Sequence, residues 1–581
     1  MVGAERAAGS GQRAAGSGQR AAGSGQRAAG SGQRAVLFAV RSAGALYRLL
    51  DVLPVFGGDE RILSRFTLEP GSEFGVEALA AVEQSGARCI GWDEAVRSTH
   101  DLILAASPKG QLHTLRGPRV LLPHGAGFNK ALSEEGSPGL PSGLDPAYLL
   151  ADGRPWAALH ALAHPDQVDR LAAHSPSAAA RAAVVGDPTL DRILASAHHR
   201  EHYRTALGTG GRELVVLTST WGPESLLRRR PGLPAALAAR LPYDAYQLAL
   251  VVHPNEHSRI GGFDLARQLA PALDAGMVLA PPFEEWAALL VACDAVITDH
   301  GSTALYAAAL DRRIVSVTDG GPELIAGSPM AAVLAQVPRL TDPAGVAAAL
   351  RSDRSGGTRR FAEYAFAEPS FAEPDHALNR LREELYRHLE LAPPATSVRA
   401  RPLPAPTADV RTPAAFAVRA RIEGTRVHVE RLPAHLDTPA HHLAAEHPGA
   451  SAAQRQSAGL LFRRAAPPSS LPHSETWTAA GWTARVLADH PGCRTAAAVL
   501  SPGTCLVRRR DGDLLTVRVE PWRAAGRVVR TDPAAALSAV HAWLGAHPGR
   551  RAPVTLSCRT GVHTVQVALT PATEAELSYE L

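Results

Sequence analysis

Val291 to Val317 reads VACDAVITDHGSTALYAAALDRRIVSV, and this stretch decides the class of fold. Ala295 to Thr298 is a short apolar run with β-branched residues, which predicts a buried strand. Thr303 to Leu310 is rich in Ala and Leu and predicts a helix, and Ile314 to Val317 predicts a second strand. A strand, a helix and a strand in this order are typical of a parallel α/β sheet.

The polar segment Asp299-His300-Gly301-Ser302 separates the first strand from the helix. In an open parallel sheet this segment lies at the carboxyl end of a strand, next to a helix N-terminus whose free amides attract anions. We therefore expect a phosphate-binding segment here. An ordinary strand–helix turn, with Ser302 or Thr303 as the N-cap, is the alternative.

Composition limits the classes of function. With 581 residues, of which 45% are hydrophobic, the chain should form about three or four globular domains. The 60 basic and 56 acidic residues leave a net charge of only +4. This balance argues against nucleic acid or an anionic membrane as the main partner.

Cysteine usage and hydropathy indicate the compartment. The five cysteines are scattered and form no CxxC pair, so neither a disulfide framework nor a zinc site is predicted. We expect no transmembrane segment, because the chain contains no run of about 18 apolar residues, and no signal peptide. These features predict a cytoplasmic protein. They are also compatible with peripheral association at the inner membrane face.

Residues 1–34 end in four identical copies of AAGSGQR, which fill residues 7–34. The repeat contains no large apolar side chain and cannot bury a core. We expect a disordered N-terminal tail.

Residues 35–186 alternate strands and helices and predict a first Rossmann-like domain. At the end of one predicted strand stands Pro123-His124-Gly125-Ala126-Gly127-Phe128-Asn129-Lys130, where His124 supplies a titratable group, Gly125 allows close backbone approach and Lys130 supplies a cation. The predicted strands are Val36–Val40, Ile62–Leu68, Cys89–Ile90, Leu102–Ala105, Val120–Leu122 and Ala183–Val185; the predicted helices are Ala43–Leu50, Phe74–Glu83 and His164–Ala172; and Ala157–Leu162 is a strand or a short helix.

Residues 187–391 predict a second Rossmann-like domain, with polar residues after each strand. Thr220 and Trp221 follow one strand and His253 follows the next. Two such domains face to face would bring His124, Trp221, His253 and Ser302 toward one crevice. The further predicted strands are Leu214–Thr218, Gln247–Val252 and Met277–Ala280, and the predicted helices are Thr189–Ser196, Pro282–Ala292, one directly after Glu323, and the amphipathic Asn379–Leu389.

Residues 392–413 are rich in Pro and predict a linker, and residues 414–581 predict a smaller α+β domain. Its apolar–polar alternation predicts hairpins, and its His residues have no metal-ligand spacing. The alternating stretches are Ala417–Leu432, Cys505–Val519 and Val554–Leu569, and the predicted helices are Ala450–Leu461 and Ala534–Leu544.

Several nucleotide and hydrolase motifs are missing. The chain has no GxxxxGK[ST] loop, no GxGxxG after the first strand and no GxSxG elbow. These absences argue against nucleoside triphosphatases, dehydrogenases and α/β-hydrolases.

Four short motifs occur in a familiar order. Together they resemble the GT-B glycosyltransferase architecture, and within it the CDP-glycerol glycerophosphotransferase family, which builds teichoic-acid polymers; the resemblance covers about residues 36–391. The motifs are His124-Gly125, Gly186-Asp187-Pro188-x-x-Asp191, His253-Pro254 and Thr298-Asp299-x-x-Ser302-Thr303.

The resemblance implies roles for these residues. His124 would be the general base for the acceptor hydroxyl, His253 would lie near the donor diphosphate, and the segment from Thr298 to Thr303, with Asp299, His300 and Gly301, would hold the donor phosphates. Gly125, Lys130, Thr220, Trp221 and Glu323 are the other substrate-binding candidates.

The resemblance also implies what the protein would bind. The nucleotide-activated donor would be a substrate, and we expect no cofactor and no metal. The acceptor would be a hydroxyl, with a membrane-associated polymer as one possibility. The chain departs from the family pattern where HGAGFNK lacks the usual Thr-Pro after His-Gly, and where His300 replaces an aromatic residue.

Two other functions stay open. Non-hydrolysing UDP-sugar 2-epimerases share the fold, and Gly186, Asp191, His253, Gly301 and Pro322-Glu323 echo their motifs. A catalytically silent GT-B scaffold that binds a nucleotide or a protein partner is the third hypothesis. CDP preference would argue against the epimerase, and binding without turnover would indicate the scaffold.

Overall fold

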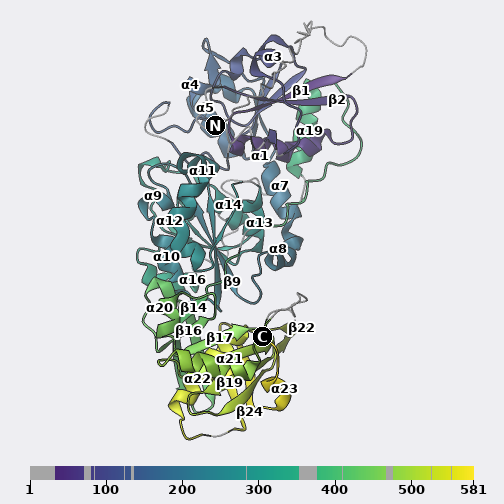
Figure 1. Ribbon diagram of the computed structural model, residues 1–581. Helices are drawn as coiled ribbons and strands as arrows, with labels where there is room; N and C mark the ends of the chain where they lie inside the picture. The colour runs from purple at the N-terminus through teal and green to yellow at the C-terminus, as the bar shows by residue number, and fades with distance from the viewer. Residues whose placement is uncertain are drawn as a thin grey trace, which may run out of the picture.

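Three folded units are stacked along the molecule (Figure 1). The computed structural model describes residues 33–70, 80, 82–83, 85–123, 125–131, 136–282, 284–352, 376–407, 410–465, 475–524, 526–550 and 552–581. Residues 1–32 of the predicted N-terminal tail, most of the helix predicted over Phe74–Glu83, and His124 lie outside these ranges. Arg34, the last residue of the predicted tail, already belongs to the first strand.

The first unit is a parallel sheet of six strands in the order β2-β1-β3-β4-β7-β8. Its central strands are apolar on both faces, as expected for a parallel sheet covered by helices. The predicted strands are confirmed, except that Cys89 forms only an isolated bridge with Phe66. The strands are β1 (Arg34–Val40), β2 (Ile62–Leu68), β3 (Leu102–Ala105), β4 (Arg119–Leu121), β7 (Leu159–Leu162) and β8 (Ala182–Val184), with a side hairpin of β5 (Leu150–Ala151) and β6 (Arg154–Pro155). The helices are α1 (Ala43–Val52), α3 (Trp92–Arg97), α4 (Pro146–Leu149), α5 (Pro165–His174) and α6 (Pro176–Ala179), with single turns η1 (Leu53–Phe56) and η2 (Leu112–Thr114).

The second unit is a parallel sheet of five strands in the order β11-β10-β9-β12-β13. The stretch from Val291 to Val317 forms the strand–helix–strand unit that its sequence predicts. The strands are β9 (Glu213–Ser219), β10 (Tyr246–Val252), β11 (Val278–Leu279), β12 (Ala295–Thr298) and β13 (Arg313–Ser316). The helices are α8 (Arg200–Ala206), α9 (Leu226–Arg229), α10 (Leu233–Ala238), α11 (Pro254–Ile260), α12 (Gly262–Asp274), α13 (Glu285–Ala292), α14 (Thr303–Ala309), α15 (Pro329–Gln336) and α16 (Val346–Leu350), with single turns η3 (Ala197–His199) and η5 (Pro343–Gly345).

The predicted turn before the next helix contains a single 3-10 turn, η4 (Gly321–Glu323). The helix predicted after Glu323 is present as α15, but it begins only at Pro329. The helix starts there because the Ser328 side chain caps it by accepting the Ala331 amide.

Two helices connect the first two units. The crossover helix α7 (Pro188–Ala195) is capped by Asp187, whose carboxylate accepts the amides of Thr189 and Leu190. The amphipathic helix α19 (His376–His388) returns to the first unit, where Leu378, Leu381 and Leu385 join its core. Figure 1 shows α19 beside α1 in the upper unit.

The described part of the segment predicted as a linker, residues 392–407 and 410–413, is packed against both units. Val398 belongs to the core of the first unit and Leu403 to that of the second. The Tyr203 hydroxyl donates to the Leu403 carbonyl at 2.9 Å, and the Thr407 amide donates to Glu285 at 2.9 Å. The segment therefore crosses the boundary between the two units as an ordered strap.

The third unit closes its strands into a nine-stranded barrel, which the sequence did not predict. Its strand order is β14-β15-β23-β24-β20-β19-β18-β17-β16. Helix α22 (Pro533–Ala546) is apolar on all sides and contacts strands around the whole barrel, so it fills the interior. The strands are β14 (Ala415–Glu423), β15 (Arg426–Pro433), β16 (His442–Glu446), β17 (Leu460–Arg464), β18 (Thr495–Ser501), β19 (Thr504–Arg509), β20 (Leu514–Val519), β23 (Val554–Thr560) and β24 (His563–Pro571).

The three predicted hairpins of this unit are confirmed. The helix predicted over Ala450–Leu461 is shorter, because α20 (Ala452–Ser457) ends before the chain enters β17 at Leu460. The remaining elements are the single turn η7 (Ala434–Leu436), the hairpin of β21 (Trp522–Ala524) and β22 (Arg527–Val529), and the helices α21 (Ala479–Asp489) and α23 (Glu574–Leu577).

The five cysteines are free thiols, four of them buried. In the described part of the chain, no helix combines the length and the apolar character that crossing a membrane requires.

Candidate functional site

A cleft between the first two units collects most of the predicted site residues. The strand order of the second sheet reverses between β9 and β12, and that of the first sheet between β1 and β3. In open α/β sheets the carboxyl ends of strands at such a reversal form a crevice for ligands. A cavity of about 280 Å³ lies here. The predicted residues that line it are Gly125, Lys130, Thr220, Trp221, His253, Asp299, His300, Gly301, Ser302 and Thr303.

The predicted base, His124, falls outside the described residues. Its neighbours Pro123 and Gly125 both line the cavity. The role of His124 therefore stays a prediction.

Asp299 orders the loop after β9. Its fully buried carboxylate accepts the amides of Thr220 at 2.8 Å, Leu226 at 2.8 Å and Gly301 at 2.9 Å. Burial raises the pKa of Asp299, while these amides and the nearby His300 act in the opposite direction. Asp299 thus fixes the relative position of the loops that follow β9 and β12.

Thr298 lies deeper than the other predicted phosphate-binding residues and is not among those that line the cavity. Its hydroxyl oxygen accepts a hydrogen bond from Thr218 at 2.8 Å between the two neighbouring strands. Its side chain is fully buried in the sheet.

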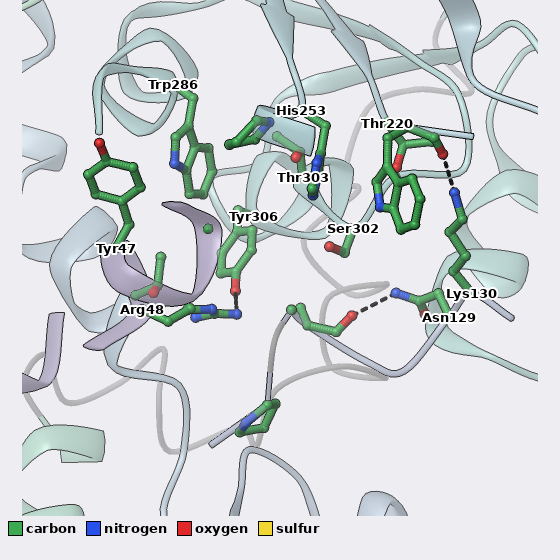
Figure 2. A pocket seen from close by; sticks show the side chains of 18 of the residues that line it. Tyr47, Arg48, Asn129, Lys130, Thr220, His253, Trp286, Ser302, Thr303 and Tyr306 are labelled. Carbon is green, nitrogen blue, oxygen red and sulfur yellow. Dashed lines mark hydrogen bonds between the residues drawn. The ribbon is translucent and has the colours of Figure 1, made fainter. Parts of the chain in front are cut away.

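Ser302 and Thr303 stand at the start of α14 and face the cavity (Figure 2). Ser302 occupies the N-cap position, yet its side chain makes no capping hydrogen bond. The alternative interpretation of the sequence is thus right about the N-cap position, but the structure does not use the Ser302 hydroxyl to cap the helix.

His253 holds a defined tautomer. Its Nδ1 accepts the Asn255 amide at 3.1 Å, so the neutral ring carries its proton on Nε2. The Trp221 ring lies 6.3 Å from the His253 ring, between centroids. His253 can therefore act as a hydrogen-bond donor in the cleft.

The Lys130 side chain extends from the first unit and contacts residues of the second. Its Nζ lies 2.9 Å from Glu323 Oε2, and the same oxygen is 3.0 Å from His300 Nε2. Burial raises the pKa of Glu323, but the hydrogen bonds from His300 and Lys130 outweigh burial, and the net pKa is lowered. Glu323 is therefore held as a carboxylate. Lys130 also donates a hydrogen bond to the Trp221 carbonyl, drawn as a dashed line in Figure 2.

Sequence reasoning missed an aromatic and cationic group at the other end of the cleft. Arg48 forms an ion pair with Asp187 at 2.8 Å and a hydrogen bond with the Tyr306 hydroxyl, which itself donates to Asp187 at 2.9 Å. Trp286 contacts Tyr306 edge to face at 5.6 Å between ring centroids. Figure 2 shows Arg48, Trp286 and Tyr306 together with Tyr47, and Lys130 with Asn129 on the opposite side.

One of the missed residues had a signal in the sequence. Tyr306 follows Thr303 by three residues, so a helix that begins at Thr303 presents both on one face. Arg48 and Trp286 come from helices whose patterns carry no comparable signal.

Metal ligands are not clustered in the described ranges: no three His, Cys, Asp or Glu side chains are placed to hold one ion.

No family model matches the chain, and no curated protein matches it in sequence. Comparison with solved structures finds similarity to the wall teichoic acid polymerase TagF, at 12% identity and a TM-score of 0.44, over 62% of this chain and 90% of that chain. MnaA from S. aureus, in a co-structure with UDP, is similar at 10% identity and a TM-score of 0.42, over 63% and 99% of the two chains. HepE from Anabaena, in complex with UDP and glucose, is similar at 15% identity and a TM-score of 0.37, over 62% and 100%.

Proposed function

We propose that this protein is a transferase that moves a glycerophosphate or glycosyl group from a nucleoside-diphosphate donor to an acceptor hydroxyl, without a metal ion. The observation that carries the proposal is the position of the cleft. It lies at the carboxyl ends of two facing parallel sheets and, in the second sheet, where the strand order reverses between β9 and β12. Ligands of open α/β sheets bind at such points.

The second unit supplies the donor side in this proposal. The hydroxyls of Ser302 and Thr303 and the imidazole of His253 line the same part of the cleft. Hydroxyl and imidazole donors suit the oxygens of a diphosphate, whose negative charge grows as its bond to the transferred group breaks.

The proposed chemistry takes one of two forms. With a CDP-glycerol-type donor, the acceptor oxygen attacks the phosphorus that bears glycerol, the phosphoanhydride bond breaks and CMP leaves. With a sugar donor, the acceptor oxygen attacks the anomeric carbon and the nucleoside diphosphate leaves. In both forms the acceptor proton passes to a base, for which His124 is the predicted residue, and His253 donates a hydrogen bond to the leaving phosphate. We further propose a polymer at the inner membrane face as the acceptor, reached peripherally from the cytoplasm.

A second candidate function, 2-epimerisation of a UDP-sugar, has one observation in its favour. Glu323 is a buried carboxylate paired with His300 beside the cleft. A carboxylate and an imidazole are the kinds of group that remove and return a proton at carbon. This reaction needs no acceptor, which separates it from transfer.

The test is phosphorus NMR of the full chain with CDP-glycerol, UDP-glucose or UDP-GlcNAc, with and without a polyol-phosphate primer. The proposal predicts release of CMP or UDP that depends on the primer. It also predicts a loss of about 100-fold or more in His253→Gln, since general acid–base catalysis typically contributes that much. His428→Gln, on the outer face of the barrel strand β15, is the matched control.

Other outcomes contradict the proposal. A UDP-sugar inverted at carbon 2 without any primer would establish the epimerase. Binding of nucleotide without turnover of any donor would indicate a silent scaffold.

A further inference from the structure

Lys130 is unusual in its residue type. The chain has 60 Lys and Arg residues, and Lys109 and Lys130 are the only lysines among them. Arginine therefore fills nearly every cationic position, whether buried or exposed. A lysine in the cleft marks a position where a compact ammonium suits the surroundings and the wide planar guanidinium of arginine does not.

The surroundings of Lys130 explain this choice. Its Nζ lies 2.9 Å from Glu323 Oε2 and 4.8 Å from the centroid of the Trp221 ring. Gly222, at a φ of +96°, packs against the pair: a β-carbon there would lie 3.1 Å from Lys130 Nζ and 3.0 Å from Glu323 Oε1. A side chain at position 222 would therefore press on both charged groups, and the glycine leaves the pair undisturbed.

One carboxylate oxygen of Glu323 accepts no hydrogen bond from the described residues. Its side chain is only 5% exposed, and its Oε2 takes both Lys130 and His300. Its other oxygen, Oε1, is buried and accepts no hydrogen bond from any residue in the described ranges. Buried carboxylate oxygens nearly always have a donor, so this oxygen calls for a group that the described residues do not supply. Glu323 lies behind Lys130, which lines the cavity.

We propose that Lys130, Glu323 and Trp221 form a subsite for the hydroxyl-bearing group, polyol or sugar, that the donor transfers. This inference rests on the proposed function. The ammonium donates to hydroxyl oxygens of the ligand, Glu323 Oε1 accepts from a hydroxyl, and the indole of Trp221 gives an apolar surface to its C–H groups.

The subsite joins both units of the cleft. Lys130 follows β4 of the first sheet, whereas Glu323 and Trp221 follow β13 and β9 of the second. The backbone fixes this contact, because the Ala131 amide donates to the Glu323 carbonyl at 3.0 Å and the Ile325 amide to the Asn129 carbonyl at 2.9 Å. In this proposal a nucleoside diphosphate, which lacks the transferred group, makes no contact with these residues. The subsite therefore adds affinity for the complete donor only.

The test is calorimetric titration of the full chain with CDP, CDP-glycerol, UDP, UDP-glucose and UDP-GlcNAc. For wild type we expect one donor to bind about tenfold or more tightly than its own diphosphate, a difference of about 1.4 kcal/mol. Lys130→Met should lose this advantage while its affinity for the diphosphate changes by less than about twofold, which also shows that the variant is folded. Lys130→Arg should weaken it as well, because a planar guanidinium directs its hydrogen bonds differently from a compact ammonium. Lys109→Arg, at the only other lysine, should behave as wild type.

Several results would overturn the assignment. One is that Lys130→Met still binds the donor more tightly than its diphosphate. Another is that Lys130→Met loses affinity for the diphosphate and the donor equally. The third is that the wild-type protein binds diphosphates but binds none of the donors more tightly. A wild-type protein that binds no nucleotide at all overturns the proposed function itself, and the subsite falls with it.

Discussion

Gly125 of the first unit lies so close to Ser302 of the second that a β-carbon at position 125 would fall 3.0 Å from Ser302 Oγ. The loop after β4 and the start of α14 therefore touch at the centre of the cleft. The glycine is needed here because of its neighbour, since any side chain at this point would push against the Ser302 hydroxyl.

The contact between Gly125 and Ser302 can be tested by comparing two single variants with the double variant. Gly125→Ala should lower the free energy of unfolding by about 1 kcal/mol, because the added methyl overpacks against Ser302 Oγ. Ser302→Ala should relieve that cost, since the nearest atom is then the β-carbon of residue 302 at 3.9 Å. Urea denaturation of both single variants and the double variant measures the coupling. If Gly125→Ala costs as much in the Ser302→Ala background as in wild type, the contact is not tight.

Asp299 is expected to stabilise the donor-side loops. Asp299→Asn replaces one carboxylate oxygen by an NH2 group that faces backbone amides. It should lower the free energy of unfolding by about 2 kcal/mol. Urea denaturation measures the loss, and amide hydrogen exchange should increase at Thr220 and Leu226 in particular. Asp319→Asn, whose side chain is 69% exposed, is the control. Equal effects of the two substitutions would contradict the role given to Asp299.

Arg431 is expected to join the barrel to the second unit. Its fully buried guanidinium contacts Asp244 at 2.6 Å and Asp532 at 2.8 Å. Arg431→Met removes the ion pair of Asp244 and leaves Asp532 with Arg464 alone. It should cost about 3–5 kcal/mol of stability, visible as earlier barrel unfolding in urea. Arg421→Met, at a side chain that is 80% exposed, is the matched control and should cost less than about 1 kcal/mol. An Arg431 variant as stable as that control would refute the prediction.

His541 is expected to make the barrel sensitive to acid. Burial lowers the pKa of His541 to about 4, with the nearby Arg494 acting in the same direction. The unfolded chain takes up a proton near about pH 6.5, whereas the folded barrel does so only near about pH 4, so stability is lost as pH falls between these values. The loss is about 2 kcal/mol from about pH 8 to about pH 5. Thermal melts of wild type and His541→Gln should diverge over this range, and parallel pH profiles would contradict the assignment.

The strand–helix repeat of the first two units was predictable because it depends on local patterns. Strands such as β9 and β12 are continuous apolar runs followed by turn residues, and a helix that starts at Thr303 follows from its Ala and Leu content. The same rule placed Trp221, His253 and Ser302 at one edge, which the structure confirms.

The rest depends on long-range packing. Nothing local in α22 shows that strands close around it, although its all-round apolar surface agrees with a buried helix. Residues 392–413 have the composition of a linker, yet Val398 and Leu403 are fixed by cores that other segments build. The partners of Lys130 lie far away in sequence, so only the fold shows that this residue meets Glu323 and Trp221.

The most direct test of the central claim is a thermal-shift titration of the full chain with CMP, CDP, CDP-glycerol, UDP, UDP-GlcNAc and GDP. A ligand at about 100 times its dissociation constant should stabilise the folded protein by about 2.7 kcal/mol. We predict a selective rise in melting temperature with one nucleotide and its activated donor. No shift with any of the six would contradict a nucleotide-dependent transferase.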